Sequence, residues 1–598
     1  MYLPIVVDNV NNAGMVETWL GYNHNARIGA GEFYDEENMS SDNYPLLSPR
    51  KIRPKLIDTG KDVIRGALLA NGNIAYLAGK TFHYSTVSID LSEYFGDDAE
   101  SDQQIVRFGA YALIFPAGIW INLSKTSEYG PMKETISAAA GTTITYSMTS
   151  ISGAEYNPVV SDTAPELVSP STGVYWLDTK EGEQGLYLWD ASAQQWQGIA
   201  STYIKITIPG AKLTEKFAEG DAVTLNTKYP DINDGSIIQA IGDDYMVVQG
   251  LMSKATDTET TSATWTLTIT RKIPTLDYVC VANNRVWGCH YGEDGFGGLV
   301  NEIYASKLGD FKNWYTYAGA STDSYALSIG MGEKFTGAVE YHGYPTFFKE
   351  DYVLKIYGAV PSEFQLITNS CRGVQDGSYK SIVKLNEYLI YKSPSDVVVY
   401  DGSNPTPISK AFGRGKMYYD AVAGGCLNRY HIVMEDVRGN PVYLVYDLQY
   451  GIWTKYDNLR VKFFTSGENG QFYAATKSEI FGVGSNENSM FLNPMVSEEY
   501  VNWSATTGDI GLEYAGRKLL KRLTLRAYIP ATSEIVVQIA YDGRPFENIG
   551  VMRGHGDVQS KSFDISPFRC DHYRIRFAGH GDVRIYTMQS TVEEVSER

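Results

Sequence analysis

The stretch LNRYHIVMEDVRGNPVYLVYDLQYGIWTKY, residues 427–456, shows the pattern that decides the fold. Two apolar segments are separated by a polar turn, and a second turn leads into a short aromatic segment. Runs rich in Val, Ile and Tyr that are bounded by Gly, Asn and Asp are typical of strands joined by tight turns. The stretch therefore predicts consecutive β-strands linked as hairpins.

Two hairpins share an aromatic-Asp-x5-Trp pattern, in residues 446–453 (YDLQYGIW) and 189–196 (WDASAQQW). The turn Asp can accept hydrogen bonds from nearby backbone amides, and the Trp can anchor the returning strand. We therefore expect both segments to form a tight turn that is closed in this way.

The same texture recurs along the chain at a spacing of roughly 40–50 residues, which is typical of β-propeller blades. The repeat is structural, because no invariant dipeptide recurs. Its further copies lie in residues 64–85, 103–124, 276–292, 337–358, 381–404 and 463–486. The sequence therefore predicts a β-propeller.

Composition supports an all-β protein with several domains. The 598 residues include 57 Gly and 44 Tyr, and 13% of the residues are aromatic. A single core stops growing near roughly 250–300 residues, so two to four domains are expected. We predict a β-propeller with an inserted small β domain and a C-terminal β-sandwich. The expected boundaries are 1–55 (N-terminal arm), 56–126 (first propeller part), 127–271 (inserted β domain), 272–494 (second propeller part) and 495–598 (sandwich).

The chain is acidic, with a formal net charge of -19 from 70 acidic and 51 basic residues. Proteins that bind nucleic-acid phosphates rely on clustered Lys and Arg, so the charge argues against that class. An acidic channel wall would instead let a passing duplex slide without sticking. Net charge alone does not place these acids on such a wall.

The cysteines and the start of the chain indicate assembly in a reducing compartment. Five cysteines, an odd number, give no disulfide framework in a chain of this size. The start MYLPIVVDNVNN lacks a basic region followed by an apolar run, so no secretory signal is expected. The most apolar stretch, residues 108–121, is shorter than the roughly 20 residues that span a bilayer, and it predicts two buried strands.

Two groups of residues raise the question of a metal site. Cys280, Cys289 and His290 lie close together in sequence, but zinc sites usually show a C-x2-C pair, so buried cysteines on adjacent strands are favoured. The tetrapeptide GHGD occurs at 554–557 and at 579–582. Its glycines suit hairpin turns with positive φ better than a metal site made by His555, Asp557, His580 and Asp582.

Glycine-rich segments at 293–301 (EDGFGGLVN) and 413–418 (GRGKMY) resemble phosphate-binding loops only in composition. Neither matches G-x-x-x-x-G-K-[ST], and neither follows a strand that feeds a helix. Both are interpreted as ordinary loops.

Motifs for catalysis are weak in this sequence. No serine lies in a G-x-S-x-G elbow and no cysteine carries a protease signature. A carboxylate pair for glycoside cleavage stays open, because 70 acidic residues offer many pairs. The turn motif of sialidases, which are also propellers, is loosely echoed by residues 306–314 (SKLGDFKNW).

Four segments together resemble the tail nozzle, or packaged-DNA stabilisation, proteins of bacteriophages, especially short-tailed ones. They are GEFYDEENMSSDNYPLLSPRK (31–51), NNRVWGCHYG (283–292), NEIYASKLGDFKNW (301–314) and HYRIRFAGHGDVRIYTMQSTVEE (572–594). They span most of the chain in the order found in the family.

The resemblance implies a structural virion protein that assembles as a ring, commonly a hexamer, below the portal and adaptor. Such a ring would retain packaged DNA, line its exit channel, contact passing genomic DNA without sequence specificity, and carry tail fibres or a tail plug. The family supplies no catalytic, cofactor-binding or metal-binding residues. We therefore expect no enzyme and no cofactor, no membrane-spanning segment, and a location in the phage tail after assembly in the host cytoplasm.

A receptor- or glycan-binding propeller of a tail spike or fibre, with or without glycan cleavage, is the alternative. Trp176, Trp189 and Trp196 could stack on sugars, although a hairpin core explains them equally well. A structural hub of a long-tailed phage is a third possibility.

Residues 284–314 combine Cys, His, carboxylates and glycines, and we interpret them as scaffold. They are expected to form propeller strands and a connecting loop, with residues 293–301 as an exposed loop. Trp287, Tyr304 and Trp314 are the expected packing anchors.

Overall fold

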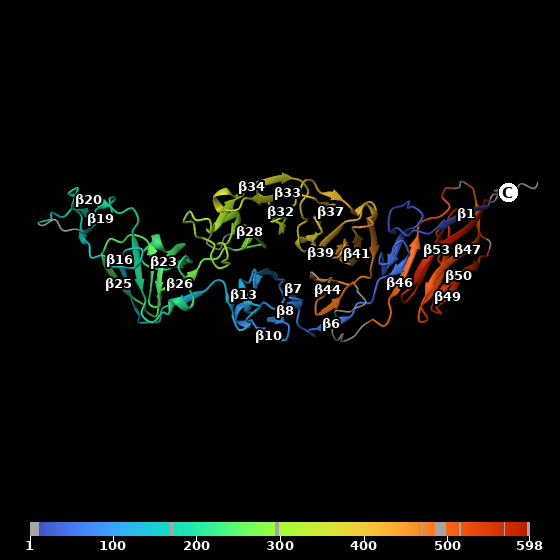
Figure 1. Ribbon diagram of the computed structural model, residues 1–598, viewed down its shortest axis with the longest axis horizontal. Coiled ribbons are helices and arrows are strands. Elements are labelled where there is room, and N and C mark those ends of the chain that lie inside the picture. Colours follow the sequence, from blue (N-terminus) through green and yellow to red (C-terminus); the bar gives the residue numbers. More distant parts are fainter. Residues whose placement is uncertain are drawn as a thin grey trace, which may run out of the picture. The chain divides into compact units, whose positions relative to one another are not determined.

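The computed structural model describes residues 11–167, 173–293, 298–467, 470–484, 498–513, 516–566 and 568–594. Strands and turns dominate these residues, which confirms the all-β class (Figure 1). Helical structure in the described ranges is confined to short turns: α1 (Ser92–Phe95), η1 (Leu213–Glu215), η2 (Pro230–Ile232), η3 (Pro361–Glu363), η4 (Tyr379–Ser381) and η5 (Ser409–Phe412). None of the described helices has the length and apolar character needed to cross a membrane.

The chain divides into two compact units. Unit 1 comprises Met1–Gln103, Phe347–Val353 and Thr368–Arg598, and unit 2 comprises Gln104–Thr346 and Leu354–Ile367. The sites described below lie within unit 1 or within unit 2.

The predicted β-propeller is confirmed, and seven four-stranded sheets among the described residues have the strand order of its blades. Their strands are, blade by blade: β7 (Ile64–Ala70), β8 (Asn73–Ala78), β9 (Thr81–Tyr84) and β10 (Val87–Asp90); β11 (Gln104–Phe108), β12 (Tyr111–Phe115), β13 (Ile119–Asn122) and β14 (Tyr129–Pro131); β27 (Tyr278–Ala282), β28 (Arg285–Glu293), β29 (Leu299–Ala305) and β30 (Tyr325–Ser328); β31 (Gly337–Tyr341), β32 (Tyr344–Lys349), β33 (Tyr352–Tyr357) and β34 (Gln365–Ser370); β35 (Val383–Leu385), β36 (Tyr388–Lys392), β37 (Val397–Tyr400) and β38 (Thr406–Pro407); β39 (Tyr418–Cys426), β40 (Arg429–Asp436), β41 (Pro441–Asp447) and β42 (Ile452–Lys455); and β43 (Phe463–Ser466), β44 (Phe472–Ala475), β45 (Glu479–Gly482) and β6 (Lys55–Asp58).

The last blade is completed by a strand from the start of the chain. β45 pairs antiparallel with β6, so that Ile480 lies opposite Ile57. β43 also packs against β7 of the first blade, where Phe463 and Ile64 share one buried cluster. A strand from the start of the chain therefore completes the last blade, and buried apolar side chains pack this blade against the first.

The hairpin predicted at 446–453 is confirmed in detail. Asp447 Oδ1 accepts hydrogen bonds from the backbone N–H groups of Gln449 at 3.0 Å and Tyr450 at 3.3 Å. Trp453 lies across the strand pair from Tyr446, with their ring centroids 4.9 Å apart. The turn Asp closes the loop and the buried Trp fixes the returning strand, as the sequence pattern indicated.

An inserted β domain interrupts the blades between β14 and β27. Its larger sheet runs β15 (Thr135–Ser137), β26 (Thr268–Arg271), β22 (Ala222–Leu225), β23 (Ser236–Gly242), β24 (Tyr245–Gln249), β21 (Tyr203–Thr207), β16 (Thr143–Thr149) and β25 (Thr256–Thr260). Its smaller sheet runs β17 (Val159–Ser161), β18 (Tyr175–Asp178), β19 (Gly185–Asp190) and β20 (Gln195–Gly198). The insert has its own buried cluster, which includes Tyr146, Ile206 and Val248.

The hairpin of the insert follows the same rule as the one in the propeller. Asp190 Oδ1 accepts hydrogen bonds from the backbone N–H groups of Ser192 at 2.8 Å and Ala193 at 3.0 Å. Trp189 and Trp196 face each other across β19 and β20, with ring centroids 5.2 Å apart. The shared pattern therefore marks the same local structure in two different domains.

The C-terminal sandwich has two sheets. One runs β1 (Asn11–Val16), β53 (Arg584–Glu594), β47 (Lys518–Ile529) and β50 (Asp557–Asp564), with β51 (Arg569–Cys570) also paired to β47. The other runs β2 (Gly21–Tyr22), β3 (Glu32–Glu37), β46 (Asn502–Thr507), β52 (Tyr573–His580), β48 (Glu534–Tyr541) and β49 (Glu547–Arg553). One buried cluster joins residues of both sheets, including Phe33, Leu525, Ile539 and Phe577.

The interpretation of residues 1–55 as an arm is wrong for residues 11–55. β1 pairs with β53 and β3 pairs with β46, so this segment supplies strands to both sheets of the sandwich. A short ribbon of β4 (Met39–Ser40) and β5 (Ser48–Pro49) follows. Few apolar residues show a period here because the segment enters sheets whose other strands lie roughly 500 positions away, and it is buried by them.

Candidate functional site

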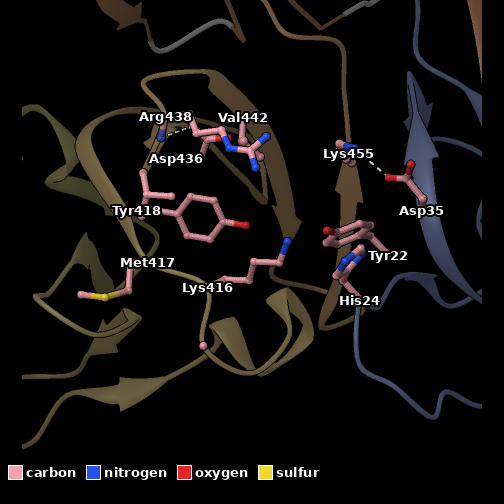
Figure 2. Close-up of a pocket in the computed structure, with 12 residues that line it drawn as sticks. Tyr22, His24, Asp35, Lys416, Met417, Tyr418, Asp436, Arg438, Val442 and Lys455 are labelled. Carbon is pink, nitrogen blue, oxygen red and sulfur yellow. Dashed lines mark hydrogen bonds and ion pairs between the residues drawn. The ribbon is translucent and has the colours of Figure 1, made fainter.

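A cavity of about 470 Å3 lies beside Tyr418 in unit 1 (Figure 2). One wall comes from the N-terminal segment, through Tyr22, His24 and Asp35. The opposite wall comes from residues 415–418 and from β40, β41, β42 and the turn at 436–438. The cavity therefore forms where the sandwich strands β2 and β3 meet one propeller blade.

The loop GRGKMY bends as a glycine turn, which confirms its interpretation as an ordinary loop. Gly413 has φ of 91°, and a Cβ there would lie 2.8 Å from the backbone oxygen of His24. Gly415 also has positive φ, at 77°. The loop leaves η5 and enters β39, so it precedes a strand and feeds no helix. The two glycines bring Lys416 and Tyr418 to the cavity.

Aromatic rings form much of the wall. The rings of Tyr22 and His24 are stacked with centroids 6.0 Å apart, and His24 is stacked on Tyr34 at 4.2 Å. His24 Nδ1 also lies 2.8 Å from the Tyr34 backbone oxygen, which orients the imidazole. Burial, together with the neighbouring Tyr418, raises the pKa of Tyr22 well above its usual range, so this phenol stays neutral.

Cations lie between these rings. Figure 2 shows Lys416 extending between Tyr418 and Tyr22, with Arg438 above the Tyr418 ring. Lys455 also lines the cavity, and its Nζ lies 2.7 Å from Asp35 Oδ1. The arrangement offers positive charge, N–H donors and aromatic faces to an oxygen-rich ligand.

Glu36 is a buried carboxyl directly behind this wall. A register shift in β3 between Phe33 and Asp35 leaves Asp35 exposed and buries Glu36, which is 1% exposed. The Lys455 backbone N–H donates to Glu36 Oε2 at 3.3 Å, while Oε1 has no hydrogen-bond partner among the described residues. Burial raises the pKa of Glu36 to about 8, so the carboxyl is largely protonated at neutral pH.

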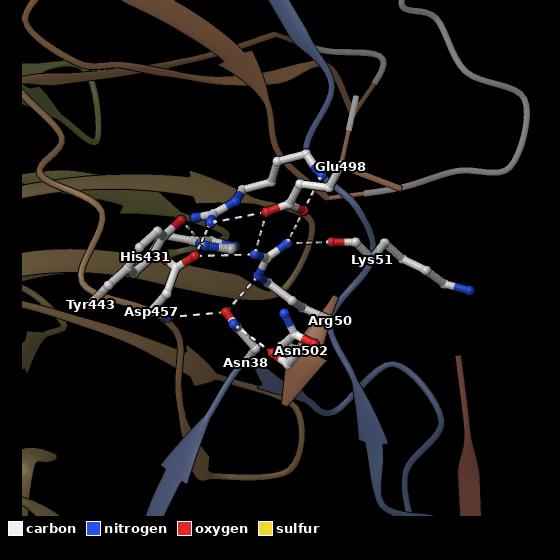
Figure 3. Close-up of polar contacts among 9 residues, drawn as sticks. Asn38, Arg50, Lys51, His431, Tyr443, Asp457, Glu498 and Asn502 are labelled. Atoms are coloured by element: carbon white, nitrogen blue, oxygen red, sulfur yellow. Dashed lines mark hydrogen bonds and ion pairs between the residues drawn. The ribbon is translucent and has the colours of Figure 1, made fainter. Parts of the chain in front are cut away.

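A buried polar network lies near the same junction (Figure 3). Arg50 Nη1 and Nη2 contact the two carboxylate oxygens of Glu498 at 2.7 Å and 2.8 Å. Arg50 Nη2 also contacts Asp457 Oδ2 at 3.1 Å, and its Nε donates to Asn38 Oδ1 at 2.7 Å. Burial acts to raise the pKa of Glu498, but the hydrogen bonds and positive charges of Arg50 and Arg53 together outweigh it, and the pKa falls below its usual range.

A buried histidine lies within this network. Burial lowers the pKa of His431 to about 3, helped by the neighbouring Arg429 and Arg53, so the imidazole is neutral. Its Nδ1 lies 3.0 Å from the Tyr443 hydroxyl. The network joins the N-terminal segment to blade β39–β42 and to the residues just before β46, so its role is to fix that junction.

The Cys and His group in the propeller is packed into the blade. Cys280 on β27 and Cys289 on β28 are both buried on adjacent strands, as expected. His290 Nδ1 lies 2.9 Å from Asp277 Oδ1, and His290 Nε2 lies 2.9 Å from the Glu293 backbone oxygen. Across residues 11–594, leaving out the gaps given above, no three His, Cys, Asp or Glu side chains are placed to hold a metal ion.

The two GHGD segments form turns, as expected. Gly556 and Gly581 have φ of 82° and 84°. The first glycine of each segment serves a different purpose, because a Cβ on Gly554 or Gly579 would collide with the backbone oxygen of Pro530 or Glu534. The close backbone approach explains these glycines without a metal.

The anchors expected in residues 284–314 are buried. Trp287 is 1% exposed, Tyr304 is 5% exposed and Trp314 is 0% exposed. Trp314 Nε1 donates to the Phe311 backbone oxygen at 2.9 Å. These contacts support the scaffold interpretation. The loop expected at 293–301 is too long, because Glu293 ends β28 and pairs with Leu299, where β29 begins; residues 294–297 lie outside the described residues.

Three of the four Trp residues of the insert, Trp176, Trp189 and Trp196, pack together with Tyr187. Trp176 is stacked on Tyr187 with centroids 4.8 Å apart, and it lies 5.7 Å from Trp196. With the Trp189–Trp196 contact, these rings form the hairpin core that the sequence offered as one of two readings. Sequence reasoning did not find Tyr22, His24 and Asp35, because they were assigned to an arm and no local pattern links them to residues 415–455.

Comparison with known proteins gives no family. No family model matches the chain, and no curated protein matches it. Solved structures that match include an exo-beta-1,3-galactanase from Phanerochaete chrysosporium, at 9% identity and a TM-score of 0.21, over 52% of this chain and 94% of that chain. An engineered GH43 glycoside hydrolase matches at 8% identity and a TM-score of 0.21, over 53% and 97% of the two chains. Dihydro-heme d1 dehydrogenase NirN matches at 10% identity and a TM-score of 0.25, over 66% and 77%.

These matches correct one expectation. We expected no enzyme, but glycoside hydrolases are among the similar structures, and this contradicts the exclusion of enzymatic activity. At such low identity and TM-score, the matches assign no particular activity to this chain either. The propeller and sandwich described above stand on the strand pairing itself.

Proposed function

We propose that this chain is a structural protein of a bacteriophage tail, of the nozzle or packaged-DNA stabilisation type. The observation that carries the proposal is the role of residues 31–51, the segment of the resemblance that lies nearest the start of the chain. Phe33 and Met39 are in the sandwich core, and Arg50 is 4% exposed in the network of Figure 3. The segment therefore ties one propeller blade to the sandwich, as a subunit under mechanical load requires.

The other segments that carry the resemblance also form strands and buried core residues. Residues 283–292 and 301–314 build β28, β29 and the buried Trp314. Residues 572–594 build β52 and β53, whose Phe577 and Ile585 are fully buried. The segments that carry the resemblance thus contribute buried core residues, which fits a structural protein.

In this proposal, identical copies form a closed ring through a heterologous interface that repeats around an axis. A hexamer is the expected number of copies. The ring would lie below the portal and adaptor, retain packaged DNA, and carry fibres or a tail plug. The net charge of -19 would let genomic DNA pass without adhering.

Imaging and mass measurement test this proposal. Purified protein, examined by negative-stain electron microscopy and mass photometry, is expected to form rings with a central channel. Antibody labelling of phage particles should place the chain at the tail exit. A protein that stays monomeric at high concentration and is absent from particles would overturn the proposal.

A second candidate function is carbohydrate recognition, with or without cleavage, by a receptor-binding propeller. The cavity beside Tyr418 favours it, because aromatic rings and N–H donors line one concave surface. A glycan array and an assay for released reducing ends test it. Binding without release would indicate a lectin, and release would indicate a glycosidase. If neither binding nor release is observed, the ring proposal is the only one that remains.

A further inference from the structure

The surface around the loop at 413–418 is basic, although the chain as a whole is acidic. A second hollow of about 330 Å3 shares Gly415, Lys416 and Tyr418 with the cavity of about 470 Å3. Three carboxylates line the two hollows together, although the whole chain has 70 acidic and 51 basic residues. The basic lining residues are Lys392, Lys410, Arg414, Lys416, Arg438 and Lys455, and we call the two hollows the basic groove.

The three carboxylates already have partners. Asp35 pairs with Lys455 at 2.7 Å. Asp396 Oδ2 pairs with Arg372 at 2.7 Å. Asp436 Oδ1 accepts hydrogen bonds from the backbone N–H groups of residues 438 and 440 at 2.8 Å and 2.9 Å. Their negative charge is therefore used within the protein and offsets little of the surrounding positive charge.

Several basic side chains of the groove, unlike its carboxylates, have no partner among the described residues. The side chains of Lys410, Arg414 and Lys416 form no ion pair or hydrogen bond with any residue that the structure describes, and all three are exposed. Long basic side chains can be free on any surface, but here they border concave space. The position of these charges favours an anionic ligand.

One lysine of the groove is buried. Lys392 is 2% exposed, and its Nζ donates to the backbone oxygens of Ser393 and Pro394. An ammonium group has three N–H bonds, so one remains after these two contacts within the described residues. Burial lowers the pKa of Lys392 to about 8, which shows that its charge is poorly solvated. A bound anion would relieve that cost.

We propose that the basic groove binds an acidic saccharide, a sugar whose carboxylate or phosphate meets Lys416 and Arg438 while its C–H face lies against Met417 and Tyr418. The proposal goes beyond the ring role and rests on the carbohydrate-recognition candidate, for which it names the ligand class. The concave groove and its aromatic lining suit one or two sugar units. A nucleic acid strand is disfavoured because the chain as a whole repels an extended polyanion.

Isothermal titration calorimetry of the full-length chain tests the proposal. The probes are a galacturonic acid trisaccharide, glucose 6-phosphate, their neutral counterparts galactotriose and glucose, inorganic phosphate, and a short single-stranded oligonucleotide. An acidic sugar is expected to bind at least about tenfold more tightly than its neutral counterpart, and to lose affinity as salt rises. The first two probes separate a carboxylate from a phosphate as the source of charge.

Variants show where the ligand binds. Lys416→Gln combined with Arg438→Gln should weaken acidic-sugar binding at least about tenfold, since each removes one charge-assisted hydrogen bond. Lys477→Gln removes one positive charge at an exposed position on another blade, and it should leave binding unchanged. A thermal melt of each variant verifies folding.

The outcomes are distinct. Equal binding of acidic and neutral sugars overturns the acidic class but keeps the carbohydrate-recognition candidate, whereas absence of all sugar binding overturns both. Binding of inorganic phosphate or the oligonucleotide as tight as that of the acidic sugars overturns the saccharide assignment. Binding that survives the double substitution overturns the location. None of these results bears on ring assembly, which imaging measures separately.

Discussion

Arg50 forms a two-pronged ion pair with Glu498, although 448 positions separate them in the sequence. The guanidinium side chain is 3% exposed and the carboxylate side chain is 32% exposed. The pair joins the segment that follows β5 to the residues that precede β46. It thus ties the sandwich to the segment that follows β42, where Asp457 makes a further contact with Arg50.

Glu498→Gln is expected to lower the free energy of unfolding by about 2 kcal/mol, because it leaves Arg50 buried with a weaker partner. This is below the cost for a fully buried pair, since the Glu498 side chain is partly exposed. Chemical denaturation of the full-length chain measures it. Glu183→Gln breaks the exposed pair with Lys180 and should change stability by less than about 1 kcal/mol. Equal effects of the two substitutions would show that the Arg50–Glu498 ion pair adds no more stability than an exposed pair.

The raised pKa of Glu36 predicts that the protein loses stability as pH rises. Its pKa is about 8 in the folded protein and 4.5 for an ordinary Glu, so between these values the folded state binds a proton that the unfolded state releases. This stability is fully present below about pH 4.5 and is lost as pH rises through 8, at up to about 1.4 kcal/mol per pH unit. Glu36→Gln should therefore gain stability over the natural protein between pH 5 and pH 8.

The control for this prediction is Glu37→Gln, which changes an exposed neighbour on the same strand. Its melting temperature should follow that of the natural protein at every pH. The Glu36 account fails if both variants show the same dependence on pH.

His431 predicts a loss of stability in acid. Burial holds its folded pKa at about 3, below the usual 6.5, so the unfolded state binds more protons between these values. Its contribution is present above about pH 6.5 and is lost as pH falls toward 3. His431→Gln should flatten the acid side of the stability profile, even if it lowers stability near neutrality through the lost contact with Tyr443.

Thermal melts between pH 4 and pH 7 test this, and His555→Gln serves as the control because its turn position is not part of the network. An unchanged slope in His431→Gln would show that another group causes the acid sensitivity. The expected slopes of Glu36 and His431 have opposite signs, so the two single variants should change the pH profile in opposite directions.

Trp314→Ala is expected to lower the free energy of unfolding by about 3–5 kcal/mol, since it empties a fully buried site and removes the hydrogen bond to Phe311. Denaturation curves measure the loss. Leu308→Ala lies in the same connection but its side chain is 41% exposed, so its cost should stay below about 1 kcal/mol. A Trp314→Ala variant that folds normally and loses one specific activity would show that the segment does more than pack.

Hairpins could be predicted from local sequence because the forces that form them are local. The Asp447 turn and the Trp189–Trp196 pair each involve residues fewer than ten positions apart, so turn chemistry and strand alternation sufficed. The same holds for the buried Cys280 and Cys289, whose strands are neighbours along the chain.

The N-terminal segment could not be predicted in this way. β3 has a register shift and a burial pattern that does not alternate strictly, and its partners in β46 and β42 lie more than 400 positions ahead. The cavity beside Tyr418 and the basic groove depend on this segment, so neither could be located from periodicity. The segment is rich in Asn, Ser and acidic residues, so its composition predicted an arm. These polar side chains instead form hydrogen bonds with strands that are distant in the sequence.

The sequence by itself determined that the chain is built of β-hairpins, that they repeat as propeller blades, and that the glycines and tryptophans serve turns and packing, because each of these depends on neighbours in the chain. The tertiary structure alone decided that residues 11–58 complete both the sandwich and the last blade, that Arg50 meets Glu498, and that six basic residues gather in one groove of an acidic protein. Such contacts are selected by the packing of whole sheets, and a linear pattern carries no record of which distant strand will lie alongside.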